Sequence, residues 1–400
     1  MTTPRKILAL ELVRRWRASL PPPEHTEFLQ DLRVRVTRMA AQVCNKPELQ
    51  YFGSVATGFC RADADADFSL TYRSFDPYLQ GVVRFDEQNS KKLSRLSRTA
   101  ANEGMKGVRF VDATIPVVQF EDPATNLKCD VTIGNLGGVE NSKMLKCMHD
   151  VHPVVPLYVH TVKEWAKAKE VIAPEKMSFN SFTVTTMAIA VLQELAVMPV
   201  FLNQSGELGE LTVPDVEAAI ALFKLPPIYH TLGKDDDAMM GEACLFLLES
   251  FAKYYRAFDF VNGTVSLMFP RRMRTLYKEV AAEYLRNLAI KKRSVWEQYH
   301  TEHLREAGPF DENALSATLQ SEAAQRNPGA PFVVEDFANL VNCGRRVHAP
   351  RAKVLLEEFG KLQQQLASGT ATVGELLAPT NRFAKSFVDS RLDKRVKHFD

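Results

Sequence analysis

The sequence predicts an α+β protein in which a small mixed sheet with helices comes first and a mainly helical domain follows. Short apolar strands and helices alternate along the chain up to about residue 150. Beyond that point most segments have helical periodicity, so we expect a second domain that faces the first across a cleft. With 400 residues, 46% of them hydrophobic, the chain is long enough for two or three domains.

The elements of the first domain follow from the spacing of apolar side chains. A helix is predicted over 26–44, and a polar, basic surface helix over 86–102. In the second of these, Leu93 and Leu96 are the only inward candidates. Short apolar segments predict strands at 49–52, 68–72, 108–111, 115–120 and 129–133.

The later part of the chain is predicted to be helical at 154–169, 181–197, 215–223, 239–258, 272–305 and 351–367. We expect the N-terminal helices within 1–40 to pack on the second domain, and 41–150 to form the sheet domain. The helical domain would comprise 151–270 and 326–370. An extra helical element, 271–325 together with 371–400, would bridge the two domains.

Composition limits the classes of function. The formal net charge is only +2, so any surface for nucleic acid must be a local basic patch. No apolar run reaches the length of a membrane span, and no membrane association is expected. The six cysteines form no CxxC pair, which is typical of reduced thiols in an intracellular protein. The spacing of His149 with His152, and of His300 with His303, is helical, but no cysteine lies near enough in sequence to complete a zinc site.

The first residues are strongly basic, and two interpretations remain open. Arg5, Lys6, Arg14, Arg15 and Arg17 stand against one acid, Glu11. That bias is typical of a mitochondrial transit peptide. It equally suits an amphipathic first helix that ends at the three prolines 21–23 and packs on the body of the protein.

The segment from residue 52 to 68 holds the strongest chemical signal. Gly53 and Ser54 form a Gly-Ser turn before a helix, which offers backbone N–H groups and a hydroxyl to a phosphate. Asp65 and Asp67 are two residues apart on a predicted strand, so their carboxylates share one face. Two clustered carboxylates repel each other unless a cation such as Mg²⁺ neutralises them. Pairing Asp63 with Asp65 instead is rejected, because the spacing from Ser54 fits the later pair.

A third carboxylate lies in the apolar strand around Asp130. An aspartate in the middle of a buried-looking strand is costly unless it is paired or bound to metal. Three carboxylates from adjacent strands can bridge two divalent ions. Asp65, Asp67 and Asp130 are therefore the predicted ligands of two Mg²⁺ or Mn²⁺ ions.

The order Gly-Ser, Asp-x-Asp, third Asp resembles the DNA polymerase β nucleotidyltransferase superfamily, with its small palm sheet. Downstream motifs are similar to those of its terminal uridylyltransferases and their poly(A) polymerase relatives. They are Gly138-Val139-Glu140-Asn141-Ser142 with Leu145, Lys163-Glu164-Trp165-Ala166-Lys167, Ser181-Phe182 with Met187 and Leu192, the segment from Leu248 to Ser266, and Val334-Glu335-Asp336-Phe337 before Asn342-Cys343-Gly344-Arg345. Size and motifs look closest to the compact trypanosomatid mitochondrial uridylyltransferases, of the minor editosome-associated type.

The resemblance implies a template-independent transferase that adds UMP from UTP to the 3′ end of single-stranded RNA. In that family pattern Gly53, Ser54 and Ser142 belong to the UTP site, and Asn141 contacts the ribose. The implied nucleotide contacts from the helical domain are Lys163, Lys167 and Ser181 on the phosphates, Phe182 stacked on the base, and Asp336 at the uracil edge. It also implies a mitochondrial monomer that associates with proteins of an RNA-editing complex, with a cytoplasmic location as the alternative.

Several residues depart from the family pattern. No proline stands between Asp336 and Phe337, and Ala64 replaces the usual serine before Asp65. Thr114 stands where relatives often have an arginine that contacts the RNA end. Two alternative functions remain: an adenylate-adding polymerase that uses ATP, and a catalytically inactive RNA-binding scaffold.

Overall fold

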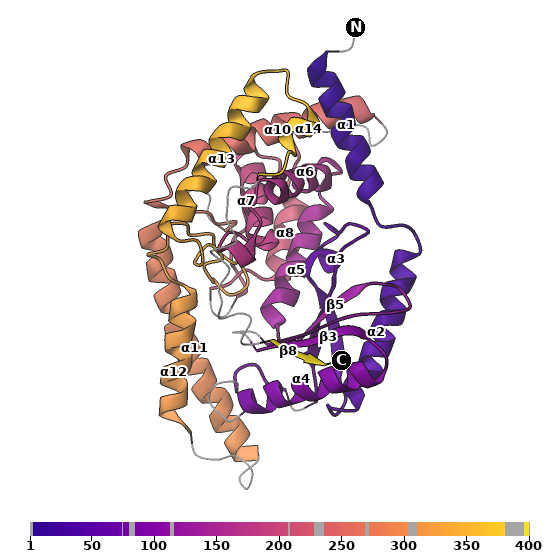
Figure 1. The fold of residues 1–400 in the computed structure, drawn as a ribbon. Coiled ribbons are helices and arrows are strands. Elements are labelled where there is room, and N and C mark those ends of the chain that lie inside the picture. Colours follow the sequence, from indigo (N-terminus) through magenta and orange to yellow (C-terminus); the bar gives the residue numbers. More distant parts are fainter. Residues whose placement is uncertain are drawn as a thin grey trace. The chain divides into compact units, whose positions relative to one another are not determined.

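The structure is a computed structural model that describes residues 3–73, 75–79, 85–112, 116–206, 209–227, 236–268, 272–302, 310–380 and 396–399 (Figure 1). The chain forms two compact units. The sheet unit comprises Pro21–Lys143, Ala282–Ala324 and Asp389–Asp400. The helical unit comprises Met1–Leu20, Met144–Ala281 and Gln325–Val388.

The sheet unit is built on a mixed sheet of six strands in the order β1-β2-β5-β4-β3-β8. Only β2 and β5 run parallel, and the other neighbours are antiparallel. The small mixed sheet predicted from the sequence is therefore confirmed. The strands are β1 (Glu48–Phe52), β2 (Ala66–Thr71), β3 (Lys106–Val111), β4 (Val117–Glu121), β5 (Lys128–Ile133) and β8 (Val396–Phe399).

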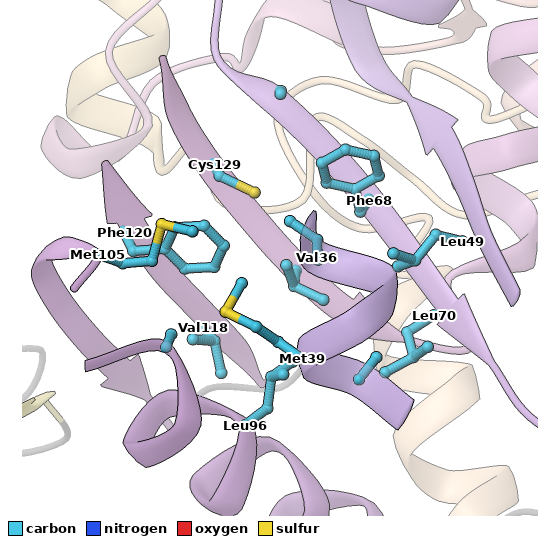
Figure 2. Close-up of a cluster of buried hydrophobic side chains, with 14 of the residues drawn as sticks. Val36, Met39, Leu49, Phe68, Leu70, Leu96, Met105, Val118, Phe120 and Cys129 are labelled. Atoms are coloured by element: carbon cyan, nitrogen blue, oxygen red, sulfur yellow. The ribbon is translucent and has the colours of Figure 1, made fainter. Parts of the chain in front are cut away.

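One face of this sheet carries the core of the unit. The helices α2 (His25–Ala41) and α4 (Phe85–Asn102) supply Val36, Met39 and Leu96 to the same buried cluster as the sheet side chains (Figure 2). Leu93 and Leu96 are buried, as the spacing within α4 predicts. Because side chains alternate along a strand, the opposite face is left for polar residues.

The helical unit packs around an aromatic core. Trp165, Phe251, Tyr255 and Phe359 are buried and contact one another through tilted and edge-on rings. Among the helices that the structure describes, none is long and apolar enough to cross a membrane. Within the described residues, the elements that lie wholly in this unit are α1 (Pro4–Ser19), α6 (Val154–Ala168), η1 (Pro174–Lys176), α7 (Ser181–Glu194), α8 (Val213–Leu222), α10 (Asp237–Ala257), β6 (Gly263–Thr264), β7 (Arg272–Met273), α13 (Ala349–Ala367) and α14 (Val373–Leu376).

The first helix is a packed part of the helical unit. Leu8, Leu12 and Val13 are buried, and α1 packs against α10. Two of its basic residues pair with acids of α10: Arg5 with Glu242 at 2.9 Å and with Glu249, and Arg17 with Asp237 at 2.5 Å. Two of the basic residues of this segment thus form ion pairs with α10. This agrees with the interpretation of the segment as an amphipathic helix that packs on the protein.

The structure corrects two expectations about packing. Helix α2 does not belong to the helical unit, because Leu32, Val36 and Met39 bury their side chains in the core of the sheet unit. The segment 371–400 does not form one extra helical element. Residues up to 380 belong to the helical unit, and 396–399 form strand β8, which pairs with the edge of β3. Most of the basic segment predicted at 380–398 lies outside the described residues.

Three further helices belong to the described part of the chain. The division between the units falls within α5 (Leu136–His149), which the periodicity had not indicated, and within α11 (Arg274–Glu302). Helix α12 (Glu312–Gln325) lies within the expected extra helical segment 271–325. Leu315 of α12 and Ala289 and Ile290 of α11 line a shallow hollow of about 290 Å³.

The turn between β4 and β5 depends on a buried carboxylate. Asp122 is 1% exposed, pairs with Arg35 of α2 at 2.6 Å and accepts the backbone N–H of Thr125 at 3.0 Å. Asp122→Ala leaves the guanidinium without its partner, so we expect the free energy of unfolding to fall by about 2–3 kcal/mol. Urea denaturation of the full chain measures this. Asp31→Ala, at an exposed position of α2, is the control, and equal stability of the two variants contradicts the assignment.

Candidate functional site

Two of the predicted carboxylates lie side by side in the sheet unit. Asp67 of β2 and Asp130 of β5 are register partners on the parallel strands. Their neighbours Phe68 and Val131 are fully buried in the core, so the alternation of the strands places both aspartates on the opposite face. Both side chains are half-buried. The structure thus brings together two carboxylates that are 63 residues apart in the sequence and meet through strand pairing.

The electrostatics of this pair are unfavourable in the absence of a cation. Burial, the largest cause, together with the charges of Asp130 and Asp65 raises the pKa of Asp67 to about 7. Burial also raises the pKa of Asp130, against the opposing effect of a hydrogen bond from Gln119. Asp65 is exposed and comes one residue before β2, yet its charge acts on both partners.

The Gly-Ser turn lies directly against this pair. Gly53 has a φ of +70°, and a Cβ atom built there would lie 2.1 Å from Oδ2 of Asp67. Only glycine fits such a position, since any side chain would displace the carboxylate. Gly53 begins the short helix α3 (Gly53–Thr57), and its N–H donates to Oγ of Ser142 at 2.9 Å.

Ser142 therefore fixes the turn from α5, where its own hydroxyl donates to the carbonyl of Gly138 at 2.7 Å. Asn141 and Ser142 are both buried, and Ser54 is half-buried. Within the sheet unit the predicted residues Gly53, Ser142 and Asp67 thus form one connected group. Gln119 also lies on this face, although it belongs to none of the motifs in the sequence. The sequence feature that could have indicated it is a polar amide within the apolar segment 117–120.

The donor set fits a hard divalent cation. Among the described residues no group of three His, Cys, Asp or Glu side chains is arranged as a finished metal site. The crowded pair Asp67 and Asp130 nevertheless supplies carboxylate oxygens, which Mg²⁺ and Mn²⁺ prefer. A bound cation would favour the charged form of both carboxylates, against the burial and the neighbouring charges that raise their pKa values.

The remaining predicted residues belong to the helical unit. The hydroxyl of Tyr158 in α6 donates to the carbonyl of Ala188 in α7 at 3.4 Å, so the two helices pack against each other. Lys163 is half-buried and Lys167 is exposed in the later part of α6, and Ser181 is the first residue of α7. Lysine side chains and a helix N-terminus both favour an anionic ligand.

An aromatic pair and a carboxylate lie further along this unit. Phe182 is half-buried, and its ring centroid is 5.5 Å from that of the buried Phe337. Oδ1 of Asp336 accepts the N–H groups of Ala338 at 2.9 Å and Asn339 at 3.0 Å. Asp336 therefore closes a tight turn, which shapes the loop that lacks the family's proline. Thr114, at the other departure from the family pattern, lies outside the described residues.

The raised pKa of Asp67 predicts a pH-dependent stability in metal-free protein. Its folded value of about 7 lies above the ordinary 3.8, so stability falls as pH rises between those values. Asp67→Asn removes the charge. We expect it to raise the free energy of unfolding at pH 8 by about 1–2 kcal/mol, and to have almost no effect near pH 4.

Thermal unfolding in EDTA at both pH values measures this difference. Asp63→Asn is the matched control, because Asp63 is three-quarters exposed in the same segment. An Asp67→Asn variant that is no more stable than the wild type at pH 8, or equally stabilised at both pH values, contradicts the crowding of the carboxylates.

Known proteins are similar to this chain in sequence and in fold. Residues 8–150 match the family model of the central palm domain of mitochondrial-like poly(A) RNA polymerase. Poly(A) RNA polymerase gld-2 homolog A of Drosophila melanogaster is 26% identical over 254 residues, which cover 61% of this chain and 18% of the relative. Terminal uridylyltransferase 7 of Homo sapiens is 23% identical over 363 residues, which cover 88% of this chain and 21% of the relative. The chain thus spans about a fifth of the length of these curated relatives.

A solved structure extends the similarity over nearly the whole chain. The Cid1 poly(U) polymerase with Mg and 3′-dATP bound has a TM-score of 0.61 at 16% identity, covering 93% of this chain and 98% of that one. At this identity the likeness shows the fold, a nucleotidyltransferase palm with a helical second domain. The comparisons do not single out the trypanosomatid mitochondrial branch. They support a relationship with the terminal uridylyltransferases and poly(A) polymerases of the polymerase β nucleotidyltransferase type.

Proposed function

We propose that this chain is a template-independent RNA nucleotidyltransferase that transfers UMP from UTP to an RNA 3′-hydroxyl and releases pyrophosphate. The observation that carries the proposal is the half-buried pair Asp67 and Asp130 on adjacent strands beside Gly53. Two neighbouring carboxylates repel each other and so destabilise the folded protein unless a cation is bound. Such a pair is therefore typical of a site that binds a divalent cation. The family model and the curated relatives support RNA as the acceptor.

In this proposal the carboxylates of the sheet unit hold two Mg²⁺ or Mn²⁺ ions. When bound, these ions lower the pKa of the attacking hydroxyl and neutralise the charge that develops on the triphosphate. Asp67 and Asp130 provide the buried oxygens, and Asp65 adds an exposed carboxylate at the start of β2. Gly53 allows the Gly-Ser turn to approach the pair, and Ser54 offers its hydroxyl to a phosphate oxygen.

The helical unit supplies the proposed contacts to the nucleotide. Lys163 and Lys167 are four residues apart on α6 and share one helix face, which suits the β- and γ-phosphates. Ser181 opens α7, whose N-terminus adds a favourable dipole. Phe182, supported by Phe337, offers a ring on which a base can stack. Asn141 in the sheet unit is the proposed contact to the ribose 2′-hydroxyl.

The base is a separate question, because stacking accepts every base. Oδ1 of Asp336 accepts two backbone N–H groups, which hold the side chain in place in its loop. Its carboxylate is the proposed acceptor for N3–H of uracil, directly or through water. Cytosine presents an acceptor at N3 and would be repelled. The match to a poly(A) polymerase family model favours ATP as the second candidate. Parallel incorporation assays with the four nucleotides distinguish them: UTP is expected to be used fastest, and faster use of ATP replaces the uridylate assignment.

We also propose that the protein acts in the mitochondrion, as a monomer that associates with an RNA-editing complex in the manner of the compact trypanosomatid enzymes. The description of the matching family model as mitochondrial-like supports the compartment. Cell fractionation and affinity purification test the location and the partners. Recovery of the full chain in the cytoplasm alone contradicts this assignment.

The first functional prediction concerns the carboxylates. Asp67→Ala and Asp130→Ala are expected to abolish nucleotide addition without loss of the fold, because each removes a cation ligand from the crowded pair. Primer extension on a single-stranded RNA oligonucleotide measures the activity, and circular dichroism measures the fold. Asp63→Ala is the control and should retain activity. Full activity in either test variant removes that residue from the site.

The second functional prediction concerns Asp336. Asp336→Asn keeps an oxygen to close the turn but replaces the other acceptor with an N–H donor. We expect the preference for UTP over CTP to fall about tenfold, with a smaller change in the maximal rate. Asp336→Ala also loosens the turn and should lower both. If Asp336→Asn keeps the full UTP-over-CTP ratio, Asp336 does not select the base.

A further inference from the structure

A polar row crosses the sheet at the level of the carboxylate pair. Asp67, Asp130, Gln119 and Arg109 are successive register partners on β2, β5, β4 and β3. Figure 2 shows their strand neighbours Val118, Phe120 and Cys129 within the buried core. The alternation of each strand therefore places the polar row on the opposite face.

Gln119 is the residue of this row that contacts a carboxylate directly. Its Nε2 donates to Oδ1 of Asp130 at 3.1 Å and to Oδ2 at 3.0 Å. Because the nitrogen is almost equally far from both oxygens, it restricts rotation of the carboxylate about its bond to Cβ. The two contacts therefore define one orientation of the Asp130 side chain.

The neutrality of this donor matters for a site that must attract a cation. Arg109 follows Gln119 in the row, is exposed, and acts on Asp130 through its charge. A guanidinium in direct contact with Asp130 would neutralise the carboxylate and compete with a divalent ion. Gln119 occupies the position between them, so the direct hydrogen-bonding partner of Asp130 is an uncharged group that does not compete with a cation.

We propose that Gln119 is a positioning residue, which holds the carboxylate of Asp130 in a fixed orientation beside Asp67 so that the pair can bind a divalent cation. The inference rests on the proposed function, in which Asp130 is a cation ligand. It extends that function to a residue of β4 that belongs to none of the motifs. Gln119 acts through Asp130 and is assigned no contact with the nucleotide or the RNA.

The test compares three variants of the full chain. Gln119→Leu has similar bulk and no donor, whereas Gln119→Lys restores a donor but adds a charge. Glu121→Gln is the matched control, since Glu121 lies two residues along the same strand and face. Two quantities are measured for each: the Mg²⁺ concentration that gives half-maximal nucleotide addition, and the rise in melting temperature with Mn²⁺ in the absence of substrate.

Loss of one hydrogen-bonding partner of a charged group predicts a clear change in the Mg²⁺ requirement. For Gln119→Leu we expect the half-saturating Mg²⁺ concentration to rise about tenfold, with a smaller loss of rate at saturating Mg²⁺, and a reduced Mn²⁺-dependent rise in melting temperature. Gln119→Lys should recover part of the rate while still needing more Mg²⁺ than the wild type. Glu121→Gln should match the wild type in both measurements.

Three results would overturn the inference. One is a Gln119→Leu variant with the Mg²⁺ requirement and Mn²⁺ response of the wild type. Another is an equal loss of rate at every Mg²⁺ concentration together with a lower melting temperature, which indicates a structural role only. The third is a wild-type protein whose melting temperature does not respond to Mn²⁺. A wild type that binds Mn²⁺ but adds no nucleotide contradicts the proposed function alone, because the thermal comparison of Gln119→Leu with wild type still decides the role of Gln119.

Discussion

The repulsion between two carboxylates on adjacent parallel strands is the constraint around which the sheet unit is organised. Asp67 and Asp130 are brought together by the register of β2 and β5, and burial makes their charges more costly. The residues around them suit that arrangement. Gly53 has no side chain to displace Oδ2 of Asp67, and Gln119 holds Asp130 with an uncharged donor.

One face of the sheet carries the hydrophobic core, and the other carries the polar residues of the candidate site. On one face α2 and α4 bury a continuous apolar cluster, and the free energy gained there offsets the unfavourable charges on the other. The ion pair between the buried Asp122 and the half-buried Arg35 joins α2 to the β4–β5 turn. The strands that carry the buried core are the same strands whose pairing aligns Gln119 with Asp130.

Much of this arrangement is predictable from the sequence, because it depends on local patterns. Apolar spacing predicted the strands and most helices to within a few residues, and the alternation around Asp67 and Asp130 predicted their face. The unit against which α2 packs was not predictable in this way, because the apolar face of a helix can pack against a sheet or against other helices. Strand β8 was missed because four residues acquire strand structure only through pairing with β3.

The role of Gln119 depends on tertiary register rather than on a motif. Nothing in the segment 117–121 shows that the amide of Gln119 faces Asp130, eleven residues further along the chain, until β4 and β5 are paired. Asp336 shows the same limit on a smaller scale, since its hydrogen bonds to the turn depend on the path of a loop that lacks the family's proline. The sequence motifs thus indicated the candidate cation ligands. The pairing of the strands determined which other residues, such as Gln119, contact them.

The central claim is that the carboxylate pair holds divalent cations for nucleotide transfer. The most direct measurement is the number of Mn²⁺ ions bound per chain, by electron paramagnetic resonance, in the presence of a UTP analogue whose α-phosphate cannot be transferred. We expect two bound ions in the wild type and loss of binding in both Asp67→Asn and Asp130→Asn. Equal Mn²⁺ binding by the wild type and these variants would contradict it.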